Sequence, residues 1–476
     1  MGINNAREIN KLKRIDEIKV NSLLKISASR KEIAGILEKA KRLERLPLED
    51  SAKLLSVTDP ALLKKIYGVA YYVKNNVYGK RVVLFVPLYI SNVCANSCLY
   101  CGFSSKNKSA ERIKLTFQEI TEQTEILLKR GHKRVLIVAG ETASSKENID
   151  YYVGAIEAVY RAEYKKNRIR RVNINVAPLS IEDFKKLKEA GIGTYQIFQE
   201  TYHEETYRKL HVAGTKSDFN NRLDAVDNAF KAGIDDVGIG PLLGLYDYRF
   251  EILAMLMHIE YLEKTYGVGP HTISVPRMKP APGSKYSLNS EYPFTDEEFK
   301  KLVSVLRLSV PYSGMIMSTR ESAGLRDVLV NLGVSQISAE SEVAPGGYEN
   351  SLKEAFNNNG GQRQFNLNDQ RSLNEIVMSL LSQGFIPSFC AACYRKNRTG
   401  GNFMDLAKPG KIKRMCNINA LITLKEYLED FAELKVKELG CKFIEEYRRG
   451  ILSKADAKIL DKFLMNVDNG ARDDCI

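Results

Sequence analysis

Between residues 82 and 338, eight short apolar segments alternate with amphipathic helical stretches, and this alternation limits the chain to folds built on a parallel sheet. In the helical stretches, such as 116–130 and 249–266, apolar residues recur at three- and four-residue spacing. Parallel neighbours need a long crossover, usually a helix, between consecutive strands. The predicted strands are residues 82–90, 134–139, 172–176, 195–198, 236–239, 272–275, 314–318 and 334–338.

The number of strands favours an α/β fold of the (β/α)8 TIM-type barrel class, although a doubly wound open sheet would show the same alternation. Polar or glycine-containing residues follow several of the strands. In a barrel these tails meet at the carboxyl ends of the strands, where barrel enzymes place their active sites. The tails are residues 91–94, 140–142, 199–201, 240–242, 319–321 and 339–341.

Three regions are predicted along the chain. Residues 1–78 are lysine-rich with helical periodicity, which indicates an N-terminal helical extension. Residues 79–345 form the barrel, and residues 346–476 form a mostly helical C-terminal domain that carries a second set of cysteines. Within that domain we expect one helix over 370–383 and a charged helical tail over 424–447 packed on the outside.

Cys94, Cys98 and Cys101 form a CX3CX2C motif directly after the first strand. Three thiolates can hold three corners of a four-iron cluster and leave the fourth iron open to a ligand. A structural zinc site would need a fourth protein ligand, and no other cysteine or histidine lies nearby in the sequence. A disulfide is not expected, because the chain shows no secretory signal.

A second set, Cys390, Cys393 and Cys416, again offers three thiolates rather than four. This predicts a second iron–sulfur cluster with an open or externally bound iron. Zinc completed by a distant histidine is the alternative, since all five histidines lie far upstream.

The net charge of +13 would suit a nucleic-acid partner, but the lysines and arginines are spread along the chain, so nucleic acid is not expected. No apolar run reaches the length of a membrane span, and a cytoplasmic protein without a membrane partner is the expectation.

Four charged or glycine positions near predicted strand ends are candidate ligand contacts. Gly140 would let the backbone approach a ligand, and Glu141 can accept hydrogen bonds from an ammonium group. Glu200 could bind ribose hydroxyls, and Arg222 could pair with a carboxylate. Judged alone, each charged residue could equally be a solvated surface group, and only its position relative to the cysteine motif favours function.

The CX3CX2C motif, with Tyr100 before its last cysteine, resembles the signature of the radical S-adenosylmethionine (SAM) family. The resemblance implies that the open iron binds the amino and carboxylate groups of SAM, and that a cluster electron breaks its carbon–sulfur bond to give a 5'-deoxyadenosyl radical. It also implies that Gly140 and Glu141 contact the SAM amino group, with Tyr100, Glu200 and Arg222 as further cofactor-binding residues.

Further segments resemble the tyrosine lyases of FeFe-hydrogenase maturation over nearly the full chain. These segments are residues 138–141, 195–203, 269–277 and 318–322 together with the second cysteine set. The barrel segments are shared with the tyrosine lyase of the thiamine pathway, whereas the second cysteine set is not.

This resemblance implies that L-tyrosine is cleaved to p-cresol and dehydroglycine, and that dehydroglycine is converted to carbon monoxide and cyanide. The second of two 4Fe-4S clusters would carry an extra iron bound through free L-cysteine and through His271. A buried passage through the barrel would join the two sites. An electron donor such as ferredoxin or flavodoxin and other hydrogenase maturation proteins are the implied partners.

The tyrosine site is predicted from the same resemblance and from residue chemistry. Arg320 can form a two-pronged contact with the substrate carboxylate. Ser318, Gln336 and Ser338 could add hydrogen bonds, and Tyr89 would line the pocket. Three other readings stay open: a thiamine-type lyase that stops at dehydroglycine, a radical SAM enzyme that modifies RNA, and a non-enzymatic iron–sulfur scaffold.

Overall fold

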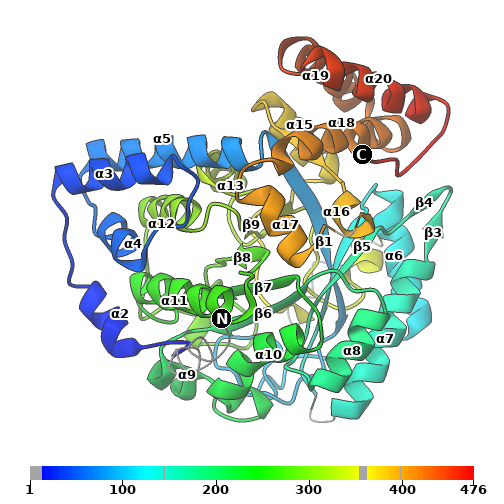
Figure 1. Ribbon diagram of the computed structural model, residues 1–476. Coiled ribbons are helices and arrows are strands. Elements are labelled where there is room, and N and C mark those ends of the chain that lie inside the picture. Colours follow the sequence, from blue (N-terminus) through cyan, green and yellow to red (C-terminus); the bar gives the residue numbers. More distant parts are fainter. Residues whose placement is uncertain (1–12, 143–144, 353–361, 397) are drawn as a thin grey trace.

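A closed barrel of eight parallel strands forms the centre of the computed structural model, which describes residues 13–142, 145–352, 362–396 and 398–476 (Figure 1). Pairing of the first strand with the last closes the barrel, with Val83 opposite Gln336 and Phe85 opposite Ser338. The predicted barrel is therefore confirmed, and the open sheet is excluded. The barrel strands are β1 (Arg81–Ser91), β2 (Arg134–Ala139), β5 (Arg171–Asn175), β6 (Tyr195–Glu200), β7 (Val237–Pro241), β8 (Thr272–Ser274), β9 (Gly314–Met317) and β10 (Gln336–Ser338).

Helices cover the outside of the barrel, so its strands are buried on both faces and read as apolar runs. Several of these helices begin at a side-chain cap, as α6 does at Thr116, whose hydroxyl and the carboxylate of Glu119 satisfy each other's backbone amides. The helices between the barrel strands are α6 (Phe117–Lys129), α7 (Ser145–Arg161), α8 (Ile181–Glu189), α9 (Glu204–Leu210), α10 (Phe219–Lys231), α11 (Tyr248–Tyr266), α12 (Asp296–Ser309) and α13 (Ala323–Leu332), with the short 3-10 turns η1 (Thr215–Ser217) and η2 (Tyr286–Leu288).

In the described chain from residue 13 on, four helices precede the barrel and pack on its side, where α5 lies against α12 and α13 (Figure 1). They are α2 (Glu17–Leu23), α3 (Arg30–Ala40), α4 (Leu48–Leu55) and α5 (Pro60–Val77). The first twelve residues of the predicted extension lie outside the described residues. No helix in the described part of the chain is long and apolar enough to cross a bilayer.

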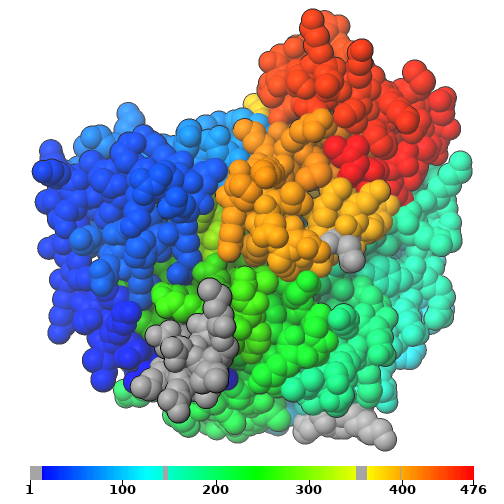
Figure 2. Space-filling model, in the orientation of Figure 1, coloured from blue at the N-terminus to red at the C-terminus, as the bar shows by residue number. Residues whose placement is uncertain are grey.

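The C-terminal region from α15 onward packs across the amino ends of the strands. Figure 2 shows side chains near residues 400–420, in orange, directly against the green segments of the barrel. Its elements are α14 (Gly347–Leu352), α15 (Leu373–Ser382), β11 (Ile386–Ser388), α16 (Ala392–Arg395), α17 (Gly400–Ala407), α18 (Ile412–Asp430), α19 (Leu434–Gly450) and α20 (Lys454–Asp468).

Several features differ from the sequence prediction. The predicted outer tail is two helices, and the first of them, α18, is largely buried. The strand β11 was not predicted; it pairs in parallel with the amino end of β1, Arg81 lying opposite Ile386. A small hairpin, β3 (Glu163–Tyr164) with β4 (Asn167–Arg168), was also missed, because two-residue strands leave no periodic pattern.

Candidate functional site

A cavity of about 180 Å³ opens at the carboxyl ends of the barrel strands, and we call it the upper pocket. The predicted strand tails do meet here. The residues predicted for the cofactor or substrate that line it are Tyr89, Cys94, Cys98, Tyr100, Cys101, Gly140, Glu141, Glu200, Arg222, Ser318, Arg320 and Ser338.

The loop that carries the first three cysteines is held against the end of β2. The amide of Ala95 donates to the carbonyl of Glu141 at 2.8 Å, and the carboxamide of Asn96 donates to the Glu141 carboxylate at 2.8 Å. A Cβ atom on Gly140 would collide with the carbonyl oxygen of Val93. Gly140 is therefore needed for close packing against the cysteine loop, a role distinct from the predicted contact with a ligand.

Burial raises the pKa of all three thiols, that of Cys101 to about 11. At neutral pH they are protonated until a metal displaces the protons, as expected for ligands whose metal affinity depends on pH. The amide of Phe103 points at the sulfur of Cys101, 3.4 Å away. Such a donor stabilises a thiolate, so the loop is suited to cluster ligation.

Two carboxylates and two cations alternate around the upper pocket. Arg222 lies 2.8 Å from Glu141 and 3.6 Å from Glu200, and Lys216 donates to Glu200 at 2.6 Å. Burial alone would raise the pKa of Glu141, but Arg222 and Lys216 hold it below its ordinary value. The buried Glu141 is therefore ionised at neutral pH and able to receive an ammonium group.

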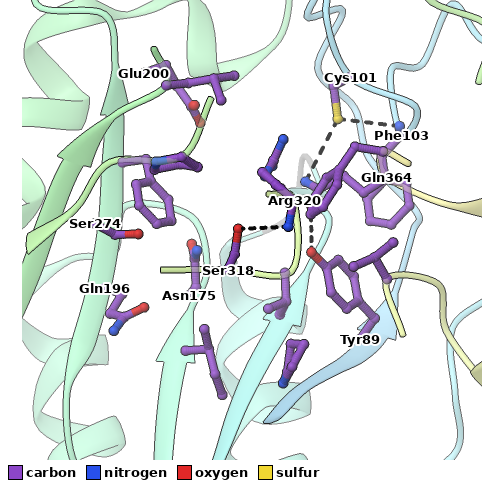
Figure 3. Close-up of a pocket in the computed structure, with 18 of the residues that line it drawn as sticks. Tyr89, Cys101, Phe103, Asn175, Gln196, Glu200, Ser274, Ser318, Arg320 and Gln364 are labelled. Carbon is purple, nitrogen blue, oxygen red and sulfur yellow. Dashed lines mark hydrogen bonds between the residues drawn. The ribbon is translucent and has the colours of Figure 1, made fainter. Parts of the chain in front are cut away.

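Glu200 is held in the left-handed backbone region, with φ of 69°. Its conformation is supported from α11, where the fully buried carboxyl of Glu251 accepts hydrogen bonds from the hydroxyl of Thr201 and from the amide of Tyr202. This arrangement turns the Glu200 side chain into the pocket at the end of β6, where Figure 3 shows it.

Tyr100 is buried beside the cysteines, and its hydroxyl lies 2.7 Å from Nε2 of His211. Burial raises the pKa of Tyr100 well above its ordinary range, so the phenol stays protonated. Its ring lines the pocket while its hydroxyl is already paired.

The other side of the upper pocket is the predicted substrate end (Figure 3). The amide of Arg320 is 3.4 Å from the hydroxyl of Ser318, and the guanidinium of Arg320 stacks 3.3 Å from the centre of the Phe365 ring. The hydroxyl of Tyr89 donates to the carboxamide oxygen of Gln364 at 2.7 Å. Arginine, tyrosine and serine thus converge where an amino acid could bind.

A second, smaller cavity of about 40 Å³ lies at the amino ends of the strands, and we call it the lower pocket. Cys390, Cys393, Cys416 and His271 all line it. The expectation that the start of β8 faces away from the first cysteine motif and toward the C-terminal region agrees with this placement.

The sulfurs of the lower pocket share features with those of the upper one. The amide of Ala392 points at the Cys390 sulfur from 3.3 Å, and burial raises the pKa of Cys390 to about 11 and that of Cys393 to about 12. His271 packs against the ring of Phe403, and its Nδ1 lies 3.7 Å from the carboxylate of Asp236. A carboxylate beside one ring nitrogen orients an imidazole whose other nitrogen can bind a metal.

Gln336 is the predicted substrate residue that the structure places elsewhere. It lines the lower pocket, whereas Ser338 lines the upper one. The two residues lie at opposite ends of the three-residue strand β10. Gln336 therefore lines a different cavity from Ser318 and Arg320.

Sequence reasoning missed many residues of the upper pocket, and four of them are Asn96, Lys216, Gln364 and Phe365. Asn96 lies within the cysteine motif and could have been found there. Lys216 follows Gly214 in a 3-10 turn, and Gln364 and Phe365 reach the pocket from a segment beyond the barrel. These three carry no local pattern that marks them.

Comparisons with known proteins agree with this geometry. A model of the Radical SAM superfamily matches residues 88–258, and a model of the Biotin and Thiamin Synthesis associated domain matches residues 274–386. The chain is 30% identical to 2-iminoacetate synthase of Escherichia coli (strain K12) over 355 residues, which are 74% of this chain and 89% of that protein.

Two solved structures resemble the whole chain. A crystal structure of HydG, a maturase of the FeFe-hydrogenase, has a TM-score of 0.92 and 44% identity over 97% of this chain and 100% of its own. HydG from Carboxydothermus hydrogenoformans has a TM-score of 0.79 and 38% identity over 97% of each chain. A radical SAM domain implies a 4Fe-4S cluster and SAM, and the thiols and charged groups of the upper pocket fit both. The chain belongs to the radical SAM superfamily and, within it, to the family of the FeFe-hydrogenase maturase HydG.

Proposed function

We propose that this enzyme cleaves L-tyrosine to p-cresol and dehydroglycine in the upper pocket and converts dehydroglycine to carbon monoxide and cyanide at the lower pocket. The product would be an iron unit with carbonyl and cyanide ligands for the FeFe-hydrogenase. The observation that carries the proposal is the placement of two three-cysteine sets in two pockets at opposite ends of one barrel.

In the upper pocket, Cys94, Cys98 and Cys101 would hold a 4Fe-4S cluster, and Glu141 would receive the SAM ammonium group. Bound SAM would supply the 5'-deoxyadenosyl radical that takes hydrogen from the tyrosine amino group. Lys216 is added to the predicted set, because the cation already pairs with Glu200 inside the pocket.

Across the cavity, Arg320 would fix the tyrosine carboxylate with its planar guanidinium, which Phe365 holds in place by stacking. Tyr89, Ser318 and Ser338 would complete the polar contacts. These groups orient the amino group of the substrate and do not themselves transfer a proton.

In the lower pocket, Cys390, Cys393 and Cys416 would hold the second 4Fe-4S cluster. His271 would bind the extra iron together with free L-cysteine, since its ring lines a cavity shared with the thiols and the carboxylate of Asp236 lies beside its Nδ1. Gln336 lines this pocket and would contact the fragment that arrives there rather than tyrosine.

The thiamine-type lyase is the second candidate, because 2-iminoacetate synthase is a relative over most of the barrel. That relative covers 74% of this chain. The second cysteine set forms a further pocket, which a reaction that stops at dehydroglycine would leave without a role. The proposal also includes ferredoxin or flavodoxin as the electron donor, other maturation proteins as partners and a cytoplasmic location. It further includes the division of the chain at residues 78/79 and 345/346.

An anaerobic assay with reconstituted protein, SAM, reductant and tyrosine tests the proposal. We expect p-cresol and trapped carbon monoxide from the wild type. Cys393→Ala should keep p-cresol and lose carbon monoxide, and Cys441→Ala, on the outer helix α19, should keep both. Cresol without carbon monoxide from the wild type would favour the thiamine-type reaction, and equal loss of both products in Cys393→Ala would refute the division between the pockets.

A further inference from the structure

The segment of residues 362–369 crosses the top of the barrel and joins two parts of the upper pocket. Its backbone accepts a hydrogen bond from the amide of Gly102 at the Gln364 carbonyl, 3.1 Å away, and the amides of Asn368 and Asp369 donate to the carbonyl of Thr319. One end of the segment thus touches the cysteine loop and the other touches the residue before Arg320.

Gly102 shows how closely the segment approaches the cysteine loop. A Cβ atom at this position would collide with the carbonyl of Arg363 and lie 3.0 Å from that of Gln364. The loop therefore needs glycine immediately after its last cysteine, and this requirement comes from the segment that packs on it.

The side chain of Gln364 lies between a cysteine and a substrate-pocket tyrosine (Figure 3). Its carboxamide nitrogen is 3.9 Å from the sulfur of Cys101, and its carboxamide oxygen accepts the hydroxyl of Tyr89 at 2.7 Å. Tyr89 also packs edge-on against Phe103, which lies on the cysteine loop.

The chemistry of the carboxamide fixes the direction of both contacts. As a cluster ligand, the sulfur of Cys101 can only accept, so the NH2 group of Gln364 must face Cys101 and its oxygen must face Tyr89. Tyr89 then donates its one proton to Gln364, and its oxygen lone pairs are left to accept a hydrogen bond from a donor in the pocket. Burial keeps the phenol protonated, because it raises the pKa of Tyr89.

We propose that Gln364 is a positioning residue that couples the substrate pocket to the cluster ligand Cys101, orienting Tyr89 as an acceptor for the substrate and donating to the cysteine sulfur. The inference deepens the proposed function and rests on it for the identity of the substrate. It adds a residue from outside the barrel to the machinery of the upper pocket.

Replacement of Gln364 by the apolar, equally long methionine tests both contacts. We expect the KM for tyrosine to rise roughly tenfold, since a buried hydrogen bond is worth about that factor. We also expect a more negative midpoint potential of the upper cluster, because lost donors to cluster sulfurs disfavour reduction. The midpoint potential is measured by electron paramagnetic resonance during a redox titration without tyrosine. This measurement therefore tests the contact with Cys101 even if tyrosine is not the substrate.

Two further variants separate the contacts. Tyr89→Phe should raise the KM and leave the midpoint unchanged, because the sulfur contact remains. In Gln364→Glu, the carboxylate can still accept a hydrogen bond from Tyr89, but it lies beside the thiolate of Cys101. This variant should therefore lower the midpoint potential of the upper cluster and raise the KM less than Gln364→Met does. It also provides the test if Gln364→Met fails to assemble a cluster.

The matched control is Gln370→Met, an exposed glutamine of the same loop. It should behave as wild type. Midpoints of both Gln364 variants equal to that of Gln370→Met would overturn the inference, as would an unchanged KM in Gln364→Met. A wild-type enzyme that forms p-cresol but no carbon monoxide would instead contradict the proposed function and leave this inference intact.

Discussion

Substitution of Asp369 by asparagine should destabilise the protein far more than the loss of an ordinary ion pair. The carboxylate of Asp369 and the guanidinium of Arg326 face each other with side-chain exposures of 0% and 1%. Arg326 also donates to the carbonyl of Ser338 at the end of β10. The neutral carboxamide of the variant would leave the cation of Arg326 buried without its counter-charge, which costs about 3–5 kcal/mol.

The magnitude can be converted to a melting temperature. An unfolding entropy of about 2.1 cal/mol/K per residue gives roughly 1 kcal/mol/K for a chain of 476 residues. The variant should therefore melt about 3–5 °C below wild type at neutral pH. Burial raises the pKa of Asp369, but Arg371 and Arg326 lower it overall, so its contribution is present above pH 3.8 and is lost as the pH falls further.

Differential scanning calorimetry of both proteins under identical anaerobic conditions measures this shift. The control is Glu204→Gln, which breaks an exposed pair with Arg208 and should cost less than about 1 kcal/mol. A shift for Asp369→Asn as small as that of the control would refute the reasoning. It would mean that the cation finds water or another acceptor in the variant.

Three other changes have defined outcomes. Gly140→Ala should abolish assembly of the upper cluster, measured as iron bound per chain, because its Cβ meets the Val93 carbonyl, whereas Gly35→Ala, with nothing within 4 Å, should assemble normally. Arg320→Lys should raise the KM for tyrosine about tenfold with a smaller change in kcat, since a lysine loses the two-pronged carboxylate contact. Burial raises the pKa of Glu251 to about 8, so wild-type stability should fall by up to about 1.4 kcal/mol per pH unit between pH 4.5 and 8. In Glu251→Gln the urea midpoint should be flatter across that range, and an equal slope would contradict the assignment.

The barrel was predictable because parallel strands buried on both faces leave continuous apolar runs. Strand 134–139 was predicted with the bounds that β2 has, while β6 extends two residues beyond its predicted end at Phe198. The extra residues include Glu200. Its charge and its left-handed backbone conformation are both atypical of a strand, so the sequence did not predict it as part of β6. Strand β11 was missed because its three residues include a proline, which argues against a strand.

The site was predictable where the residues are close in sequence to a cysteine motif or to a strand end. Gln364 lies 275 residues from its partner Tyr89, and no local pattern records that contact. Gln336, expected beside the substrate, lines the lower pocket, where it is the first residue of β10. His271 was predicted to face the C-terminal region because it directly precedes a predicted strand that begins at residue 272. The strand β8 does begin there.

Strand β1 runs without interruption from Arg81, beside the lower pocket, to Ser91, which precedes the first cysteine loop. At about 3.3 Å per residue, its eleven residues span roughly 36 Å and set the distance between the two pockets. Because β11 is hydrogen-bonded to the same strand, the C-terminal region is part of the barrel's sheet and not a separate attached domain. Inserting or deleting residues in β1 would change the separation of the two pockets, so the lower pocket cannot be exchanged as an independent module.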